Sequence, residues 1–381
     1  MNVVVPFGFY GSGNIGDEST LQGFARLVAH HGNGLRVWVA SRDPAHTSRV
    51  EPSFRYFHAV NRDLRRRWAR LRASAYAVAG GTPIMDVLGH WPLSEVVPLV
   101  RAATDTRKPI VFVGTGTETL QRPESRDLVR HALAPAVHHW TLRSERDRIR
   151  LAACGVPADR MTVAADLAWL LPPMASDFGQ SVLRDLHVPE SPRLIGINLT
   201  NEAFVATQAP HLFEEVSIFL DTLIERADTF VLFLANEIRP DESFDTTASR
   251  KVLARMRHPE RALLVPNRYW TPQQMLSIIA CCDFTISMRY HFCLFSALQR
   301  IPFFAITRSD KVADLCWDLV WPHATAPKDI RADQLLRAFE TLESDRPGRT
   351  AELSSRVSNM RQRALVNTVG LQTMLTHVHT A

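Results

Sequence analysis

The N-terminal part of the chain alternates short apolar runs with longer segments in which apolar residues recur at helical spacing. Residues 18–30 follow the first apolar run and predict a helix. The short runs predict strands at residues 3–5, 36–40, 75–79, 109–113, 139–142 and 161–164. Such alternation of strand and helix favours βαβ units that build a parallel, doubly wound sheet.

The same pattern begins again after a proline-containing linker at residues 172–177. Further strands are predicted at residues 194–198, 229–235, 262–265, 283–287 and 302–306, and helices at 211–227, 272–280 and within 332–375. We therefore expect an α/β fold of two Rossmann-like, doubly wound domains facing a cleft, as in GT-B-type enzymes. The expected parts are an N-terminal domain at 1–175, a C-terminal domain at 176–345 and a helical tail at 346–381.

Composition is that of an ordinary globular protein, with 46% hydrophobic and 22% charged residues. With 381 residues the chain is too long for one typical core, which agrees with two domains. Its five cysteines are odd in number and form no CxxC pair, so free thiols in a reducing compartment are expected. No leader peptide or membrane-spanning run is evident, and we expect a cytoplasmic location.

The net charge of +5 is partly local, because six arginines fall within residues 62–72. The favoured interpretation of this segment is a solvated helix face. A patch for nucleic acid or for an anionic membrane is the alternative, and it leaves peripheral contact with the inner face of the membrane open. Trp68 is the only aromatic residue in the segment, so nucleic-acid recognition by stacking is not expected. Formation of a homo-oligomer also stays open.

A glycine-rich loop at residues 11–18 follows the first strand and opens the first helix. It matches GxGxxG literally, but the nearest acidic residue after the second strand, Asp43, lies 27 residues beyond Gly16 instead of about 20. We therefore favour a ligand-binding loop over a dinucleotide site. The alternative is a structural turn whose acidic pair favours the helix dipole. The predicted ligand loop comprises Gly11, Gly13, Asn14, Gly16 and Asp17.

Arg289 and His291 stand between two apolar runs, where a buried strand should give way to a buried helix. An arginine keeps its charge, and burial without a partner would cost several kcal/mol. This pair suits a place where an anion is held and a proton is moved. The alternative is a capped strand end with a satisfied core histidine.

Several motifs together resemble the polysaccharide pyruvyl transferase family. They include the glycine loop with its Asn-Ile-Gly-Asp-Glu ending and the Ser-Met-Arg-Tyr-His segment at 287–291. The other matching segments lie at residues 79–86, 113–116, 142–156, 165–169 and 309–312. Ser144, Leu167 and Thr82 depart from the residues usual in the family.

The resemblance implies transfer of a pyruvyl group from phosphoenolpyruvate to a sugar, often as a ketal across two hydroxyls. It implies no cofactor and no metal, and an acceptor that is a sugar, a nucleotide sugar or a lipid-linked glycan. His291 would be the general acid/base, while Arg289, Arg143 and Lys311 would hold the donor phosphate and carboxylate. The facing, acceptor-binding wall would comprise the glycine loop with Gly80, Gly81, Asp86 and Gly114.

Other interpretations stay open at this point. Arg143 could form a surface ion pair with Glu145 or Asp147, Lys311 could be merely exposed, and Asp86 could cap a helix. For the whole chain, the alternatives are a GT-B glycosyltransferase with a nucleotide-sugar donor and an inactive binding protein of the same fold. The product, ketal or enolpyruvyl, is also open.

Overall fold

The computed structural model describes residues 1–31, 34–60, 64–190, 192–266 and 268–380. Its contacts divide the chain into two compact units. Unit 1 contains residues 1–171 and 359–381, and unit 2 contains residues 172–358. Helix α15 (Arg346–Leu365) carries the chain from unit 2 back to unit 1.

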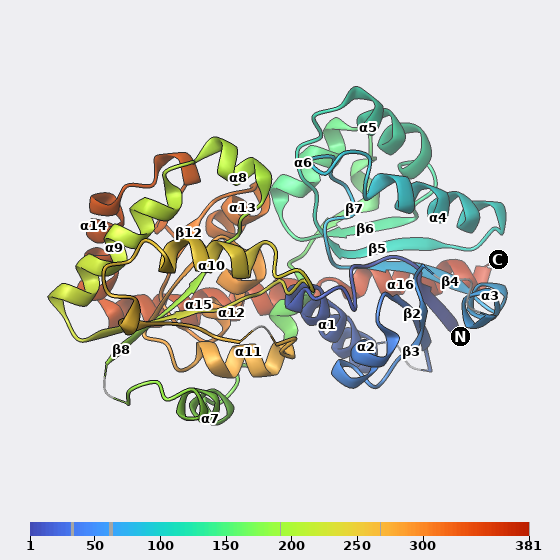
Figure 1. Ribbon diagram of the computed structural model, residues 1–381. Helices are drawn as coiled ribbons and strands as arrows, with labels where there is room; N and C mark the ends of the chain where they lie inside the picture. Colours follow the sequence, from blue (N-terminus) through green and yellow to red (C-terminus); the bar gives the residue numbers. More distant parts are fainter. Residues whose placement is uncertain (32–33, 61–63, 191, 267, 381) are drawn as a thin grey trace. The chain divides into compact units, whose positions relative to one another are not determined.

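Unit 1 is built on a seven-stranded parallel sheet in the order β3-β2-β1-β4-β5-β6-β7 (Figure 1). The strands are β1 (Asn2–Val5), β2 (Arg36–Ser41), β3 (Arg55–His58), β4 (Ala75–Ala79), β5 (Ile110–Thr115), β6 (His139–Leu142) and β7 (Met161–Val163). The helices are α1 (Ile15–His31), α2 (Pro44–Val50), α3 (Leu64–Leu71), α4 (Leu93–Asp105), α5 (Pro123–Leu128), α6 (Glu145–Ala153) and α16 (Thr368–Thr380). The strand order reverses between β1 and β4, which places the ligand-binding switch point of such a sheet there.

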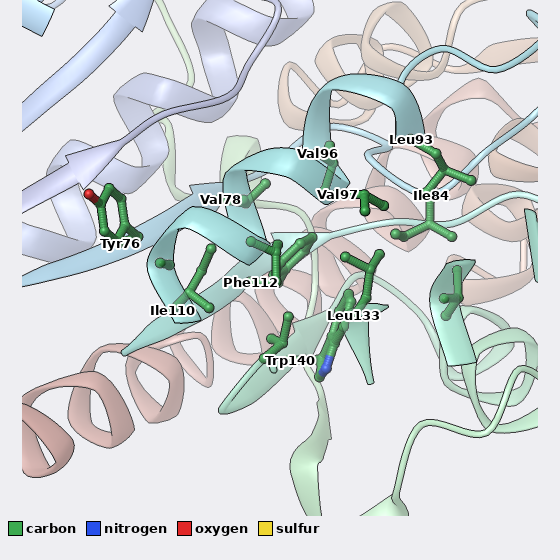
Figure 2. Packing of buried hydrophobic residues seen from close by; sticks show 14 of the residues in the cluster. Tyr76, Val78, Ile84, Leu93, Val96, Val97, Ile110, Phe112, Leu133 and Trp140 are labelled. Atoms are coloured by element: carbon green, nitrogen blue, oxygen red, sulfur yellow. The ribbon is translucent and has the colours of Figure 1, made fainter. Parts of the chain in front are cut away.

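The core of unit 1 fixes the strand ends that carry its polar residues. Figure 2 shows Val78, Phe112 and Trp140, from three neighbouring strands, packed with Val96 and Leu133 of the covering helices. The rings of Phe112 and Trp140 lie 4.2 Å apart between centroids. Each such fully buried side chain contributes about 1.5–3 kcal/mol to folding. The sheet is therefore a rigid base for the loops at its carboxyl edge.

Unit 2 repeats the plan with a six-stranded parallel sheet in the order β10-β9-β8-β11-β12-β13. The strands are β8 (Arg193–Asn198), β9 (Thr229–Phe233), β10 (Ala262–Leu264), β11 (Phe284–Ser287), β12 (Phe303–Ile306) and β13 (Ala324–Thr325). Besides α15, the helices are α7 (Asp177–Asp185), α8 (Ala203–Gln208), α9 (Leu212–Arg226), α10 (Asp245–Leu253), α11 (Pro272–Ile279), α12 (Tyr290–Leu298), α13 (Asp310–Asp318) and α14 (Ala332–Ser344). Here the order reverses between β8 and β11.

The predicted class of fold, two Rossmann-like doubly wound sheets, is confirmed, and so is each predicted strand. The sequence missed β3 and β13, which are short strands at sheet edges. Helix α11 begins as predicted, because Thr271 caps it in a capping box with Gln274. Among the described residues, no helix is both long and apolar enough to cross a membrane.

Candidate active site

Arg289 lies at the switch point of unit 2, between the end of β11 and the first turn of α12. The Ser287 hydroxyl accepts the Arg289 backbone N–H at 2.9 Å and donates to Oδ1 of Asn198, on β8, at 3.1 Å. These two bonds join the carboxyl ends of β8 and β11. They fix the backbone from which the Arg289 side chain extends.

Oxygen atoms surround the guanidinium of Arg289, a residue that is only 6% exposed. Oδ1 of Asp245 accepts hydrogen bonds from Nη2 at 2.6 Å and from Nε at 3.1 Å. Nη2 also donates to the Thr200 hydroxyl at 3.1 Å. Nη1 lies 3.0 Å from Oε1 of Glu202 and 2.9 Å from Oε2 of Glu237. Every guanidinium nitrogen is thus engaged, and the buried charge is compensated as its burial requires.

The ion pairs hold both signs of charge in place. Burial alone would lower the pKa of Arg289, but Asp245, Glu237 and Glu202 raise it above its ordinary value. Burial alone would raise the pKa of Glu237, yet Arg289, Arg239 and Arg308 hold it below the ordinary value. Near neutral pH Arg289 and Glu237 therefore stay ionised.

Arg308 extends the cluster to the neighbouring strand β12. Its Nε donates to the Met288 carbonyl at 3.0 Å, and its Nη1 pairs with Oε2 of Glu202. Glu202 therefore bridges two arginines, Arg289 and Arg308. Lys311 lies in the first turn of α13, after the same strand.

His291 lies in the first turn of α12 and is half-buried. Its ring contacts those of Tyr290 at 5.0 Å and Phe295 at 6.4 Å between centroids. Because β11 and β12 are adjacent and parallel, the structure brings Arg289, His291 and Lys311 to one edge of the sheet.

The acidic members of this cluster were missed by the sequence analysis. Thr200 and Glu202 follow β8, while Glu237 and Asp245 follow β9. The available signal was their position: polar residues just after parallel strands meet at the carboxyl edge of the sheet. The predicted roles of Arg289, His291 and Lys311 stay predictions, now with named partners for Arg289.

In unit 1 the glycine loop is held by its own neighbours. The Gly11 N–H donates to Oε1 of the buried Glu18 at 2.7 Å, and the Gly16 N–H donates to Oδ1 of Asn14 at 3.0 Å. Gly11 has a φ of 72°, and a Cβ there would lie 2.3 Å from the Asp43 backbone nitrogen. Only glycine fits such a position. Glu18 therefore closes the loop, a role that the sequence analysis did not assign.

The end of β4 lies beside this loop. A Cβ on Gly81 would be 3.8 Å from Oδ1 of Asp17, so that carboxyl group is near the β1/β4 switch point. A Cβ on Gly80 would collide with Thr20 of α1. The Gly116 N–H donates to the Gly81 carbonyl at 2.9 Å. This hydrogen bond links the segment after β4 to the segment after β5.

Arg143 lies at the end of β6 and is 4% exposed. Its Nη1 is 3.5 Å from Oδ2 of Asp166, and its Nη2 donates to the Thr82 hydroxyl at 3.2 Å. A Cβ on Gly116 would lie only 1.8 Å from Nη2, so glycine there gives the guanidinium its space. The expected alternative of a surface ion pair is wrong, because Arg143 is buried and Asp166 is its partner.

Asp86 and Gly114 have structural partners in unit 1. The two carboxylate oxygens of Asp86 accept the backbone N–H groups of Gln121 at 3.0 Å and Arg122 at 2.8 Å, just before α5. Gly114 has a φ of 63°, and a Cβ there would lie 2.6 Å from Leu167. Their predicted acceptor-binding role stays a prediction. The geometry shows that both positions also serve packing.

Histidine, cysteine and carboxylate side chains of the described part of the chain bear on metal binding and thiol reactivity. Among those residues, no group of three or more His, Cys, Asp or Glu side chains is arranged to hold a metal ion. The cysteines are free, and four of the five are buried. Burial raises the pKa of Cys281 to about 11, which disfavours its thiolate near neutral pH.

Two Rossmann-like units, each with charged side chains at its switch point, define an α/β protein of GT-B-like class. Within that class, the family description "Polysaccharide pyruvyl transferase" matches residues 14–310. The chain therefore belongs to the polysaccharide pyruvyl transferase family, as its motifs indicated. No curated protein matches it.

Solved structures show the same fold. UDP-GlcNAc 2-epimerase from Neisseria meningitidis, bound to UDP-GlcNAc, aligns with a TM-score of 0.63 at 10% identity and covers 99% of this chain and 100% of its own. Anabaena Alr3699/HepE in complex with UDP-glucose aligns with a TM-score of 0.64 at 13% identity and covers 99% of each chain. At such identities the likeness concerns the fold alone.

Proposed function

We propose that this chain transfers a pyruvyl group from phosphoenolpyruvate to a pair of hydroxyls on a sugar or glycan, forming a ketal in polysaccharide or glycoconjugate biosynthesis. The observation that carries the proposal is the buried Arg289 at the β8/β11 switch point, inside the family match, with His291 and Lys311 on the same sheet edge. Cations and a titratable imidazole at one edge suit a donor that carries a phosphate and a carboxylate.

The chemistry needs a proton donor and an anion holder. His291 would protonate the methylene carbon of the donor, which leaves an oxocarbenium-like carbon that one sugar hydroxyl attacks. The second hydroxyl then displaces the phosphate and closes the ketal, and the proton of this hydroxyl leaves with the phosphate as hydrogen phosphate. His291 would accept a hydroxyl proton as the new C–O bond forms, and Lys311 would neutralise the departing phosphate.

The ion pairs suggest how the donor would enter. Glu202 bridges Arg289 and Arg308, and its side chain, 17% exposed, is more accessible than those of Glu237 or Asp245. We propose that the donor's carboxylate or phosphate takes the place of Glu202 between the two arginines. Glu237 and Asp245 would then continue to hold Arg289.

The acceptor would bind to unit 1, where Asp17 lies near the glycine pair 80–81 and Arg143 lies near Thr82. Arg143 also stays a predicted contact of the donor. The acceptor would be a sugar, a nucleotide sugar or a lipid-linked glycan. UDP-sugars belong in the first acceptor screen because the solved structures named above carry them.

The test is a thermal-shift titration with phosphoenolpyruvate beside UDP, GDP and NAD, followed by an assay of phosphate release with candidate acceptors. A ligand at 100 times its Kd stabilises by about 2.7 kcal/mol, which is measurable. Lys311→Met should weaken the shift with phosphoenolpyruvate, whereas the exposed Lys328→Met should retain it. Arg289→Ala is a poor probe, because it would remove the positive charge that Asp245, Glu237 and Glu202 share and would therefore destabilise the fold.

Two results would overturn the proposal. A shift with UDP or GDP and none with phosphoenolpyruvate would favour a glycosyltransferase with a nucleotide-sugar donor. Phosphoenolpyruvate binding without phosphate release, across the acceptor screen, would favour a binding protein that has kept the fold without the activity.

A further inference from the structure

Helix α3 of unit 1 leaves its large apolar side chains partly or largely exposed to solvent. Leu64, Trp68 and Leu71 are four and three residues apart and so share one face of the helix. They are 78%, 39% and 81% exposed, whereas the small Ala69 is completely buried. A surface helix of a globular protein ordinarily buries its apolar stripe, so the orientation of α3 is inverted.

Arginines flank this apolar stripe. Arg65 and Arg72 are exposed on one side of it, and Arg67 on the other. No acidic residue occurs from Leu64 to Met85. Lys108 adds to the basic surface, since its Nζ donates to the carbonyl of Arg70 at 3.1 Å. The surface formed by the three apolar residues and these flanking arginines is called the α3 face below.

The contrast with α6, in the same unit, shows that arginine content alone does not make such a face. Helix α6 carries three arginines, against four in α3, and one exposed apolar residue, Ile149. It has two acidic residues among them, and Glu145 pairs with Arg148 while Asp147 pairs with Arg150. The charge of α6 is therefore largely balanced, and a single isoleucine does not make a stripe.

The α3 face is held in shape by aromatic contacts. The Trp68 ring lies 4.9 Å from that of Trp38 between centroids, and the Arg72 guanidinium lies 4.9 Å from the Trp68 ring. Arg66 donates to the Ala59 carbonyl at 3.0 Å and anchors the helix on its other side. Tryptophan and leucine flanked by arginines are the composition of helices that lie in the membrane interface.

We propose that the α3 face docks on the surface of an anionic phospholipid membrane. Leu64, Trp68 and Leu71 would enter the boundary between headgroups and acyl chains, and Arg65, Arg67 and Arg72 would contact lipid phosphates. The favoured occupant is a membrane and not a polyanion in solution, because Leu64 and Leu71 are apolar and largely exposed. The proposal rests on unit 1 alone and does not depend on the proposed pyruvyl transfer.

The experiment is flotation of the full chain with vesicles of phosphatidylcholine, and with vesicles of phosphatidylcholine and phosphatidylglycerol in about equal parts. We expect binding to the anionic vesicles that falls as salt is raised. Leu64→Ser with Leu71→Ser should abolish it, and each of Arg65→Gln, Arg67→Gln and Arg72→Gln should weaken it by about fivefold. Ile149→Ser with Arg148→Gln, on α6, is the matched control and should bind as the unchanged chain does.

The substituted side chains of α3 are exposed, so an unchanged melting temperature will show that these variants fold. Absence of binding to anionic vesicles would overturn the proposal. Binding that survives Leu64→Ser with Leu71→Ser, alongside equal binding to duplex DNA, would show a polyanion site instead. A dimer in solution that these serine substitutions dissociate, without vesicle binding, would show that a second copy of the chain covers the face.

Discussion

Oδ1 of Asp245 accepts two hydrogen bonds from Arg289, one from Nη2 at 2.6 Å and one from Nε at 3.1 Å. The other oxygen, Oδ2, accepts the backbone N–H groups of Asn236 and Glu237, each at 3.0 Å. Asp245 thus connects the segment after β9 to Arg289, which follows β11. The side chain of Asp245 is almost completely buried, so the pair is shielded from solvent.

Replacement of Asp245 should therefore destabilise the protein strongly. Asp245→Asn removes one charge from a buried ion pair, and we expect a loss of about 3 kcal/mol in the free energy of unfolding, measured by urea denaturation. Asp333→Asn is the control, because its pair with Arg337 is exposed on both sides and should change stability by less than about 0.5 kcal/mol. Equal losses in the two variants would contradict a structural role for the buried pair.

Removal of the negative charge of Glu202 should tighten donor binding. If the donor displaces Glu202 from Arg289 and Arg308, then Glu202→Gln removes a competing anion, and the Kd for phosphoenolpyruvate should fall by about tenfold, equivalent to 1.4 kcal/mol. Isothermal titration calorimetry measures this directly. Glu340→Gln, in an exposed pair with Arg226, should leave the Kd unchanged. A higher Kd in Glu202→Gln would mean that Glu202 helps to hold the donor site in shape instead of occupying the place of the donor.

Stability in acid should depend on Glu237. Its pKa in the folded state lies below the ordinary value of 4.5, so its contribution to stability is fully present above about pH 4.5 and is lost as the pH falls through the folded-state pKa. Glu237→Gln should lower stability at neutral pH and make the decline in acid shallower. Urea midpoints measured from pH 7 to about pH 3 test this. A decline parallel to that of the unchanged chain would show that Glu237 is not among the groups responsible.

Because Gly116 lies against the guanidinium of Arg143, we expect that even Gly116→Ala lowers the activity. In Gly116→Ala the new methyl group would occupy the space of Nη2 and push the guanidinium away from Thr82 and Asp166. A displacement of about 1 Å can cost about 10²-fold in kcat/KM. Arg143→Lys should lower the same parameter, since it removes the paired geometry of the guanidinium. Full activity in either variant would exclude Arg143 from substrate binding.

The proposed acid/base role of His291 has a kinetic signature. His291→Gln should lower kcat by about 10²-fold or more while leaving the affinity for phosphoenolpyruvate nearly unchanged. His187→Gln, remote in sequence from the motif, serves as the control and should retain both. An unchanged kcat in His291→Gln would exclude the role.

Much of the fold follows from the sequence because its signals are local. Apolar runs bounded by glycine or proline predict buried parallel strands, and Thr271 with Gln274 marks a helix start within four residues. The two edge strands were missed because a strand of two to four residues carries too short a pattern to recognise. The motifs around Arg289 and the glycine loop were also sufficient to indicate the family.

The partners of those motif residues could not be predicted, because they are distant in sequence. Asp245 and Glu202 lie 44 and 87 residues from Arg289, and they meet it only because β8, β9 and β11 end at one edge of a parallel sheet. In the same way, Asp166 rather than the nearby Glu145 pairs with Arg143, since β6 and β7 are neighbours in the sheet.

The sequence by itself determined the alternation of strands and helices, the presence of two α/β domains and the motif that contains Arg289 and His291. Only the tertiary structure decided which charges compensate one another and which side of α3 faces the protein. The pattern of α3 shows an amphipathic helix, but Ala69 is its buried residue because the small side chain lets the helix approach the sheet closely. Local periodicity determines whether a segment forms a helix or a strand, whereas tertiary packing determines which residues its side chains contact.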